Sequence, residues 1–170
     1  MKNEHKRESK IIGWREWVAL PLLGIPAIKG KIDTGAKTSS LHAYDISLES
    51  VGAETYVNFK VHPIQNEESL EIECRALLLD RRIVSDSGGH KEERYVIKTS
   101  LSMGGVRKKI ELTLTNRESM KYRMLIGRSA LKEFYVDPSQ SFLTGKTSKQ
   151  KEFLKEFKLH REENRSLRRE

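Results

Sequence analysis

The stretch "KGKIDTGAKTSSLHA", Lys29 to Ala43, places an aspartate directly after an apolar run and follows it with Thr-Gly-Ala and several hydroxyl residues. Asp and Gly are common turn formers, so the simplest interpretation of Asp33 is a corner between a strand and a loop. The alternative is a catalytic carboxyl group held at a strand end. The sequence on either side of the stretch bears on this choice.

The residues around this stretch predict a chain made mostly of strands. Trp14 to Ile32 contains two short apolar runs separated by Gly24, and two prolines within it forbid a long helix. Two antiparallel strands meeting near Gly24 are therefore expected. Alternating residues predict an extra hairpin within Tyr44–Leu70. The glycine-rich turns "SDSGGHKE" (residues 85–92) and Gly104-Gly105 predict two further strand reversals.

The last structured segment contains "MLIGRSAL", Met124 to Leu131. It predicts a strand that runs through Gly127 into one short helix, Ser129 to Phe134, which Asp137-Pro138 terminates. After Gly145 the chain is rich in helix formers, but the apolar face that its residues would form is too narrow to be part of a core. We therefore expect a polar lead-in at residues 1–13, one domain at residues 14–145, and a basic, partly helical and partly frayed tail at residues 146–170.

The composition and charge of the chain limit the classes of function that fit it. The 170-residue chain carries a net charge of +8, which would suit a partner of negative charge. Residues 146–170 hold nine Lys or Arg against five Glu, so about half of the surplus lies in the tail. The single cysteine, Cys74, cannot form an internal disulfide, which favours a reducing, cytoplasmic location. The charged N-terminus resembles neither a signal peptide nor a membrane span.

Motifs for nucleotides and metals are absent. Neither Gly-Lys pair, at Gly30 and Gly145, is preceded by the glycine that a phosphate-binding loop requires. The histidines share no ligand spacing, and Cys74 has no neighbouring Cys or His at a suitable distance in sequence. We therefore expect no cofactor and no metal.

An aspartic hydrolase provides a use for each residue of Asp-Thr-Gly. Its chemistry needs two carboxyl groups that share one proton, so that one activates water while the other protonates the carbonyl oxygen. Asp33 at the end of an apolar strand supplies a rigid carboxyl, and Thr34 can form a hydrogen bond across to a symmetry mate. Gly35 allows a backbone amide to approach the carboxylate. Only one copy of the motif is present.

Asp-Thr-Gly-Ala followed about ninety residues later by Leu-Ile-Gly-Arg resembles the retropepsins, the retroviral-type aspartic proteases. The Gly24 turn, nine residues before Asp33, is similar to their first hairpin, and "RRIVSDSGGHKEERYVI" is similar to their glycine-tipped flap. Within that superfamily the chain resembles a bacterial retropepsin-like group labelled ATP-dependent zinc proteases. The likeness covers roughly residues 14–142, although the ATP and zinc motifs of the label are missing.

The resemblance implies an all-β, closed acid-protease barrel with one short helix, which forms a homodimer. Asp33, Thr34 and Gly35 would be catalytic, with the Asp33 pair activating water across the dimer. Gly127 and Arg128 would support the site. A peptide or protein substrate would lie extended under the flap. The substrate contacts would come from Ala36, Ser87, Gly88, Gly89 and His90.

Alternatives remain open on the sequence alone. Lys37 would disturb proton sharing if it pointed toward Asp33, although an outward position is the preferred interpretation. Relatives of the group are linked to RimK-type ATP-grasp ligases, which add glutamate to a ribosomal protein. The chain would then be a non-proteolytic regulator of such a ligase. Nucleic-acid binding through the tail has the least support, because aromatic residues are few and no RNA-binding motif is present.

Overall fold

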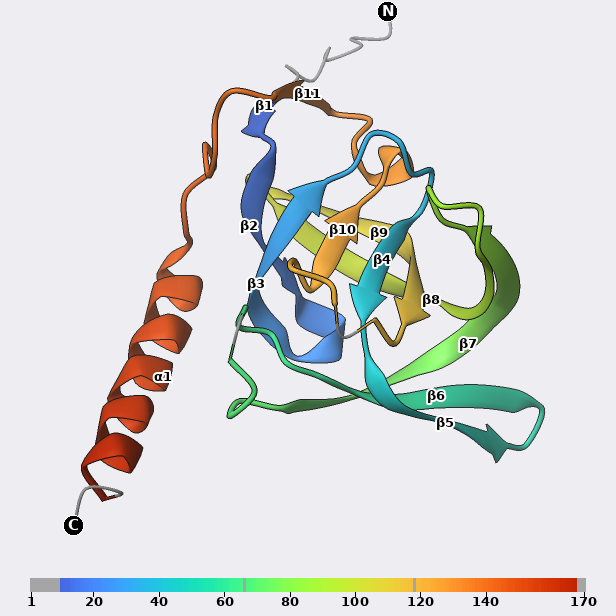
Figure 1. Ribbon diagram of the computed structural model, residues 1–170, viewed down its shortest axis with the longest axis horizontal. Coiled ribbons are helices and arrows are strands. Elements are labelled where there is room, and N and C mark those ends of the chain that lie inside the picture. The colour runs from blue at the N-terminus through green and yellow to red at the C-terminus, as the bar shows by residue number, and fades with distance from the viewer. Residues whose placement is uncertain (1–9, 66, 118, 168–170) are drawn as a thin grey trace, which may run out of the picture.

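The computed structural model describes residues 10–65, 67–117 and 119–167 (Figure 1). Strands dominate, so the prediction of a mostly β protein is confirmed. A nine-stranded sheet has the order β2-β3-β10-β4-β9-β8-β7-β6-β5, and β1 pairs with β11 in a separate two-stranded sheet. The strands are β1 (Lys10–Gly13), β2 (Arg15–Leu20), β3 (Ile25–Ile32), β4 (Ser39–His42), β5 (Tyr44–Val51), β6 (Glu54–Val61), β7 (Ile72–Ser85), β8 (Lys91–Met103), β9 (Val106–Thr115), β10 (Met124–Ile126) and β11 (Phe134–Asp137).

The large sheet curls into a ring around the apolar core. Besides pairing with β3, strand β2 pairs with β8 through Ala19 and Ser102, which connects the first strand of the sheet to one in its middle. Alternate residues of the ring strands point inward and are removed from solvent. Fully buried side chains from five of these strands are Ile28, Leu41, Ile97, Leu112 and Ile126.

The corner between β2 and β3 is built as expected. The 3-10 turn η1 (Pro21–Leu23) leads to Gly24, whose φ of 70° places it in the left-handed region. The two strands then pair antiparallel, with Trp17 opposite Lys29. Upstream, the expected lead-in needs correction: residues 1–9 lie outside the described residues, but Lys10–Gly13 form β1 and pair parallel with β11. Pairing with β11 gives these residues backbone partners that local sequence does not reveal.

The predicted helix from Ser129 to Phe134 is wrong. Only the 3-10 turn η2 (Arg128–Ala130) forms there, and Phe134 already begins β11. The pairing of β11 with β1 explains this, since Lys10 is opposite Phe134 and the chain must be extended from that point. The register with β1 therefore overrides the local helix propensity.

The tail also differs from its prediction. Instead of a partly frayed segment, the helix α1 (Ser148–Leu167) runs continuously and lies beside β2 and β3 in Figure 1. Phe153, Leu154 and Phe157 are half-buried, and Arg161 pairs with Glu67 at 3.4 Å. Across the described part of the chain, no helix combines the length and the apolar character that spanning a membrane would need.

The hairpin of β5 and β6 is confirmed, as is the long β7–β8 hairpin. Strands β5 and β6 continue the sheet beyond β7 and extend away from the ring in Figure 1. The β7–β8 hairpin turns at residues 86–90, and its residues 82–87 line a cleft that Asp33 also lines. This places the predicted flap near Asp33.

Candidate active site

Asp33 lies where three strands interleave. It follows β3, and the chain then loops to β4, while β10 is inserted between β3 and β4 in the sheet. The Asp33 amide donates a hydrogen bond to the Ile126 carbonyl at 2.9 Å, so the first residue of the loop is attached to β10. The start of the loop is therefore supported by a strand that is distant in sequence.

The Asp33 carboxylate is held by its own loop. The Gly35 amide donates a hydrogen bond to Asp33 Oδ1 at 3.1 Å, and the Ala36 amide donates to the Asp33 carbonyl at 3.3 Å. The Asp33 side chain is half-buried, whereas Thr34 and Gly35 are exposed. The expected approach of a backbone amide to the carboxylate is therefore present. The exposed Thr34 and Gly35 leave this side of the loop uncovered within one chain.

Gly127 and Arg128 support the loop from behind. The Gly127 amide donates to Ser39 Oγ at 3.0 Å, and the Arg128 amide donates to the Ala36 carbonyl at 2.8 Å. Arg128 also donates from Nη1 to the Thr34 carbonyl at 3.0 Å. These contacts agree with the supporting role predicted for both residues, which itself remains a proposal.

The loop faces the β7–β8 hairpin across a cleft of about 740 Å³. Asp33, Gly35 and Ala36 line one side, and residues 82–87 of the hairpin, including Ser87, line the other. Thr34, Gly88, Gly89 and His90 do not line it. His90 is instead 85% exposed in its side chain at the hairpin tip. The cleft thus brings together some of the predicted residues and leaves the tip outside.

Asp86 organises the tip of this hairpin. Its Oδ1 accepts hydrogen bonds from the Gly88 and His90 amides, both at 2.9 Å, and Arg117 donates to its Oδ2 at 2.7 Å. The hydrogen bond from the His90 amide, followed by those from the Gly88 amide and the Arg117 side chain, holds the pKa of Asp86 below its usual value despite partial desolvation. Asp86 therefore fixes the turn as an ionised carboxylate at neutral pH.

Three arginines are the site residues that the sequence did not reveal. Arg82, Arg94 and Arg117 line the cleft together with Lys37, against the two acids Asp33 and Asp86. Lys37 is exposed and lines this cleft, and the preferred outward direction of its side chain stays a prediction. Arg82 contacts Glu111 at 2.5 Å, and this partner lowers the pKa of the Glu111 carboxyl group. Arg94 pairs with Glu92 at 2.9 Å.

The floor of the cleft is polar and buried. Ser40, Thr113 and Thr115 come from neighbouring strands β4 and β9, and each is less than a tenth exposed. Thr115 donates to Glu92, which in turn accepts from Arg94. The alternation in "ELTLTN" places Thr113 and Thr115 on the same face of β9. The described residues contain no group of three or more His, Cys, Asp or Glu arranged to hold a metal ion.

This interleaved aspartate loop, facing a hairpin across a cleft, has the arrangement expected of retropepsin-like proteins. Residues 11–147 match the model of the RimB-like family, described as "Retropepsin-like aspartic endopeptidase RimB". The chain therefore belongs to the RimB-like family.

Curated relatives carry a different description. The chain is 48% identical over 136 residues to a "Probable alpha-L-glutamate ligase" of Shewanella pealeana, and 43% identical over 142 residues to one of Desulfotalea psychrophila. These alignments cover 79% and 83% of this chain but only 30% and 31% of those proteins. The chain thus spans about a third of the length of these relatives.

A solved structure supports the same fold. A protein of unknown function from Legionella pneumophila superimposes with a TM-score of 0.67 at 26% sequence identity. The match covers 79% of this chain and 98% of the Legionella chain. Nearly the whole of the Legionella chain therefore shares this architecture.

Proposed function

We propose that the protein is an aspartic endopeptidase whose active site forms between two copies of the chain. The observation that carries this proposal is the position of Asp33, which is fixed between β3 and β10 and opens into the cleft under the β7–β8 hairpin. One chain supplies one such carboxyl group, and the chemistry requires two. A twofold dimer with the exposed Thr34 and Gly35 at its axis provides the second.

The reaction follows from the two carboxyl groups sharing one proton. The ionised carboxyl group accepts a proton from water as the water oxygen attacks the peptide carbonyl carbon, and the protonated one donates to the carbonyl oxygen. The tetrahedral intermediate then breaks its carbon–nitrogen bond, and the departing amine takes up a proton. The two groups titrate as a coupled pair. No cofactor takes part in this scheme.

The charge of the cleft supports a negatively charged substrate. Four cations and two acids line it, and because Arg82 and Arg94 are also paired with Glu111 and Glu92, an acidic peptide gains a modest attraction along its path to Asp33. The relatives' description as glutamate ligases makes a glutamate-rich peptide the natural first choice. A substrate bound as an extended strand also forms backbone hydrogen bonds, for which the hairpin edge is suited.

The decisive experiment compares the wild type with Asp33→Asn. Each protein is incubated with a library of peptides made from a tryptic proteome digest, and new termini are identified by mass spectrometry. We expect wild-type cleavage and at least a thousandfold loss in the variant, since a general acid–base pair is removed. Circular dichroism and sedimentation should show an unchanged fold and dimer. Cleavage that persists in Asp33→Asn would exclude Asp33 as the catalytic acid.

A second candidate function is non-proteolytic regulation of a RimK-type ligase. It is favoured by the relatives named glutamate ligases, in which the matched segment is only about 30% of a longer chain. On this proposal, a wild-type protein that cleaves no peptide still changes the rate of glutamate addition to a ribosomal protein by the ligase. Asp33→Asn should then retain that effect. A ligase rate that is unaffected by either protein contradicts this candidate.

A further inference from the structure

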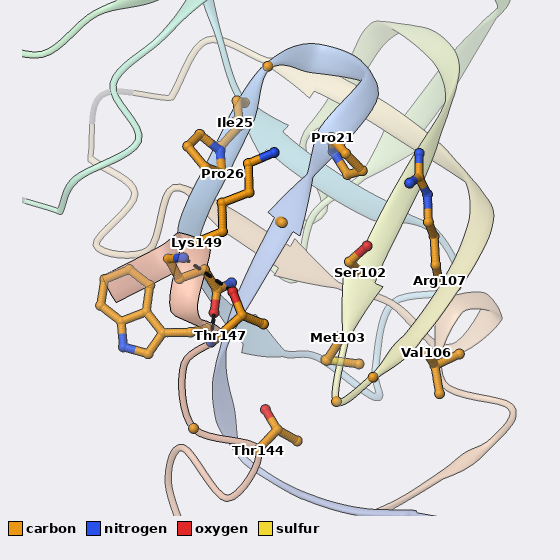
Figure 2. Close-up of a pocket in the computed structure, with 17 residues that line it drawn as sticks. Pro21, Ile25, Pro26, Ser102, Met103, Val106, Arg107, Thr144, Thr147 and Lys149 are labelled. Atoms are coloured by element: carbon orange, nitrogen blue, oxygen red, sulfur yellow. Dashed lines mark hydrogen bonds between the residues drawn. The ribbon is translucent and has the colours of Figure 1, made fainter. Parts of the chain in front are cut away.

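A second cleft lies away from Asp33, where the Gly104-Gly105 turn meets the segment leading into α1 (Figure 2). Its volume is about 480 Å³, within the range of roughly 300–1,000 Å³ that small-molecule sites occupy. It shares no lining residue with the cleft of Asp33. Any function of this cleft is therefore separate from the proposed peptidase site.

The walls of this second cleft are largely apolar. The ring contributes side chains from the β2–β3 corner and from the turn between β8 and β9, and the opposite wall is the chain from Thr144 to Gln150. Such a surface favours binding of the apolar part of a ligand, because contact removes water from the apolar surfaces of both the cleft and the ligand. The apolar residues that line it include Trp17, Pro21, Ile25, Pro26, Met103 and Val106.

Two cations complete the second cleft. Lys149 extends from the first turn of α1, and Arg107 extends from β9 on the opposite wall (Figure 2). No Asp or Glu lines the cleft. Arg107 is steadied by a hydrogen bond from its Nε to Ser100 Oγ at 3.1 Å. The charge at the cleft is therefore positive on both sides and is not balanced by a lining acid.

The wall opposite the ring is held in place. Thr144 donates hydrogen bonds from its amide and hydroxyl groups to the fully buried Glu16, at 3.0 and 2.9 Å. The Thr147 amide donates to Gln150 Oε1 and the Gln150 amide donates to Thr147 Oγ1, which caps the start of α1. The cleft is therefore largely preformed, which lowers the entropic cost of binding.

We propose that this second cleft binds a small amphipathic carboxylate, with its apolar body against Pro26 and Met103 and its charge between Lys149 and Arg107. Both cations are exposed, so the attraction is screened by salt and the binding is modest. Lys149 and Gln150 lie beyond residues 11–147, which match the family. A ligand here would therefore link α1 to the ring and would be a property added by the tail.

The test uses the full chain and 4-phenylbutanoate, with 4-phenylbutan-1-ol as the uncharged probe. Binding is followed by calorimetry and by amide shifts in ¹⁵N-labelled protein. We expect saturable binding of the carboxylate, shifts at Gly104 and Gly105, and at least fivefold weaker binding of the alcohol. Raising NaCl from 50 to 500 mM should weaken the binding of the carboxylate and leave the binding of the alcohol unchanged.

Variants assign the charge to named residues. Lys149→Met and Arg107→Met should each weaken 4-phenylbutanoate binding about two- to fivefold, the effect expected for an ion pair that is partly screened by solvent. Lys155→Met, on the exposed part of α1, should leave it unchanged. Circular dichroism checks that α1 remains helical. Equal binding of the alcohol, shifts confined to other surfaces, or unchanged affinity in both Lys149→Met and Arg107→Met would each overturn the proposal. Peptide cleavage serves as an independent readout, because neither cation lies at Asp33.

Discussion

Gly127 and Thr38 are in backbone contact. A Cβ atom added at Gly127 would lie 2.6 Å from the Thr38 carbonyl carbon and 2.8 Å from its oxygen. Real Cβ contacts are essentially never this short, so either the strand β10 or the loop after Asp33 would have to move. The contact explains why a glycine is needed where β10 passes behind the loop.

We therefore expect Gly127→Ala to lower the free energy of unfolding by about 3 kcal/mol, the upper end of the usual cost of overpacking. Peptide cleavage should fall further than stability alone explains, because the displaced loop carries Asp33. Urea unfolding and cleavage rates at a temperature where the variant is fully folded measure the two effects. Ser129→Ala, an exposed neighbour, is the control. A Gly127→Ala protein with wild-type stability would show that the loop relaxes without cost.

Lys37 provides a test of the charge at the cleft. It is exposed and lines the cleft of Asp33, so Lys37→Glu should weaken the attraction for acidic substrates. We expect the ratio of kcat/KM for a glutamate-rich peptide over a neutral one to fall about fivefold at 50 mM NaCl. The ratio cancels any change in the titration of the Asp33 pair. Lys31→Glu, which does not line the cleft, should change it little. A ratio that is insensitive to salt would contradict the electrostatic origin.

The protonation of Asp86 should make the stability of the β7–β8 hairpin tip depend on pH. Hydrogen bonds from the His90 and Gly88 amides and from the Arg117 side chain hold its pKa below the ordinary value of 3.8. A carboxyl group with a lowered pKa in the folded state contributes stability above its unfolded pKa and loses it as pH falls through the folded pKa. The hairpin tip should therefore be intact at pH 6 and loosen well below pH 4.

The amide shifts of Gly88 and His90 follow this titration directly, and their midpoint should lie below 3.8. The difference in unfolding free energy between the wild type and Asp86→Asn should shrink as pH is lowered from 6 to 3. Glu73→Gln, an exposed carboxyl in β7, should not reproduce that trend. A midpoint above 3.8 would mean that desolvation outweighs the hydrogen bonds.

Local sequence predicted the turns better than the surfaces. The corners at Gly24 and at Gly104-Gly105 depend on left-handed backbone angles that glycine adopts easily, so a short stretch of sequence identifies them. The wrong helix at residues 129–134 failed because its length is set by the pairing of β11 with β1, more than a hundred residues away. The residues near 129–134 alone therefore do not reveal where the chain must become extended to pair with β1.

The candidate site shows the same division. Asp33, Gly35 and Gly127 were predicted because motifs carry them, and their loop contacts are present. The cationic lining of the cleft was missed because Arg82 and Arg94 lie opposite each other only in the register of the β7–β8 hairpin, while Arg117 comes from the segment after β9. In sequence, each of them resembles a solvated surface arginine. That all three line the same cleft depends on how the strands pair in the sheet.

The role of Glu16 was not predicted either, because most of its hydrogen-bond partners are distant in sequence. This residue allows a test of how the C-terminal segment is attached. It is fully buried, and its carboxylate accepts hydrogen bonds from the Gly13 amide, the Leu143 amide and the amide and hydroxyl of Thr144. Glu16→Ala would leave these donors without an acceptor in a place that water does not reach. Removing one partner of a buried charged network costs about 3 kcal/mol or more.

We expect Glu16→Ala to lose roughly that free energy of unfolding in urea, with Glu16→Gln intermediate because an amide oxygen still accepts some of the bonds. The damage should be local as well: residues 141–150 should become sensitive to proteases before the ring unfolds, since Glu16 is their anchor. Limited proteolysis with mass spectrometry locates the first cuts. Glu152→Ala, an exposed acid on α1, is the matched control. First cuts within β8 or β9 would instead show that Glu16 supports the ring as a whole.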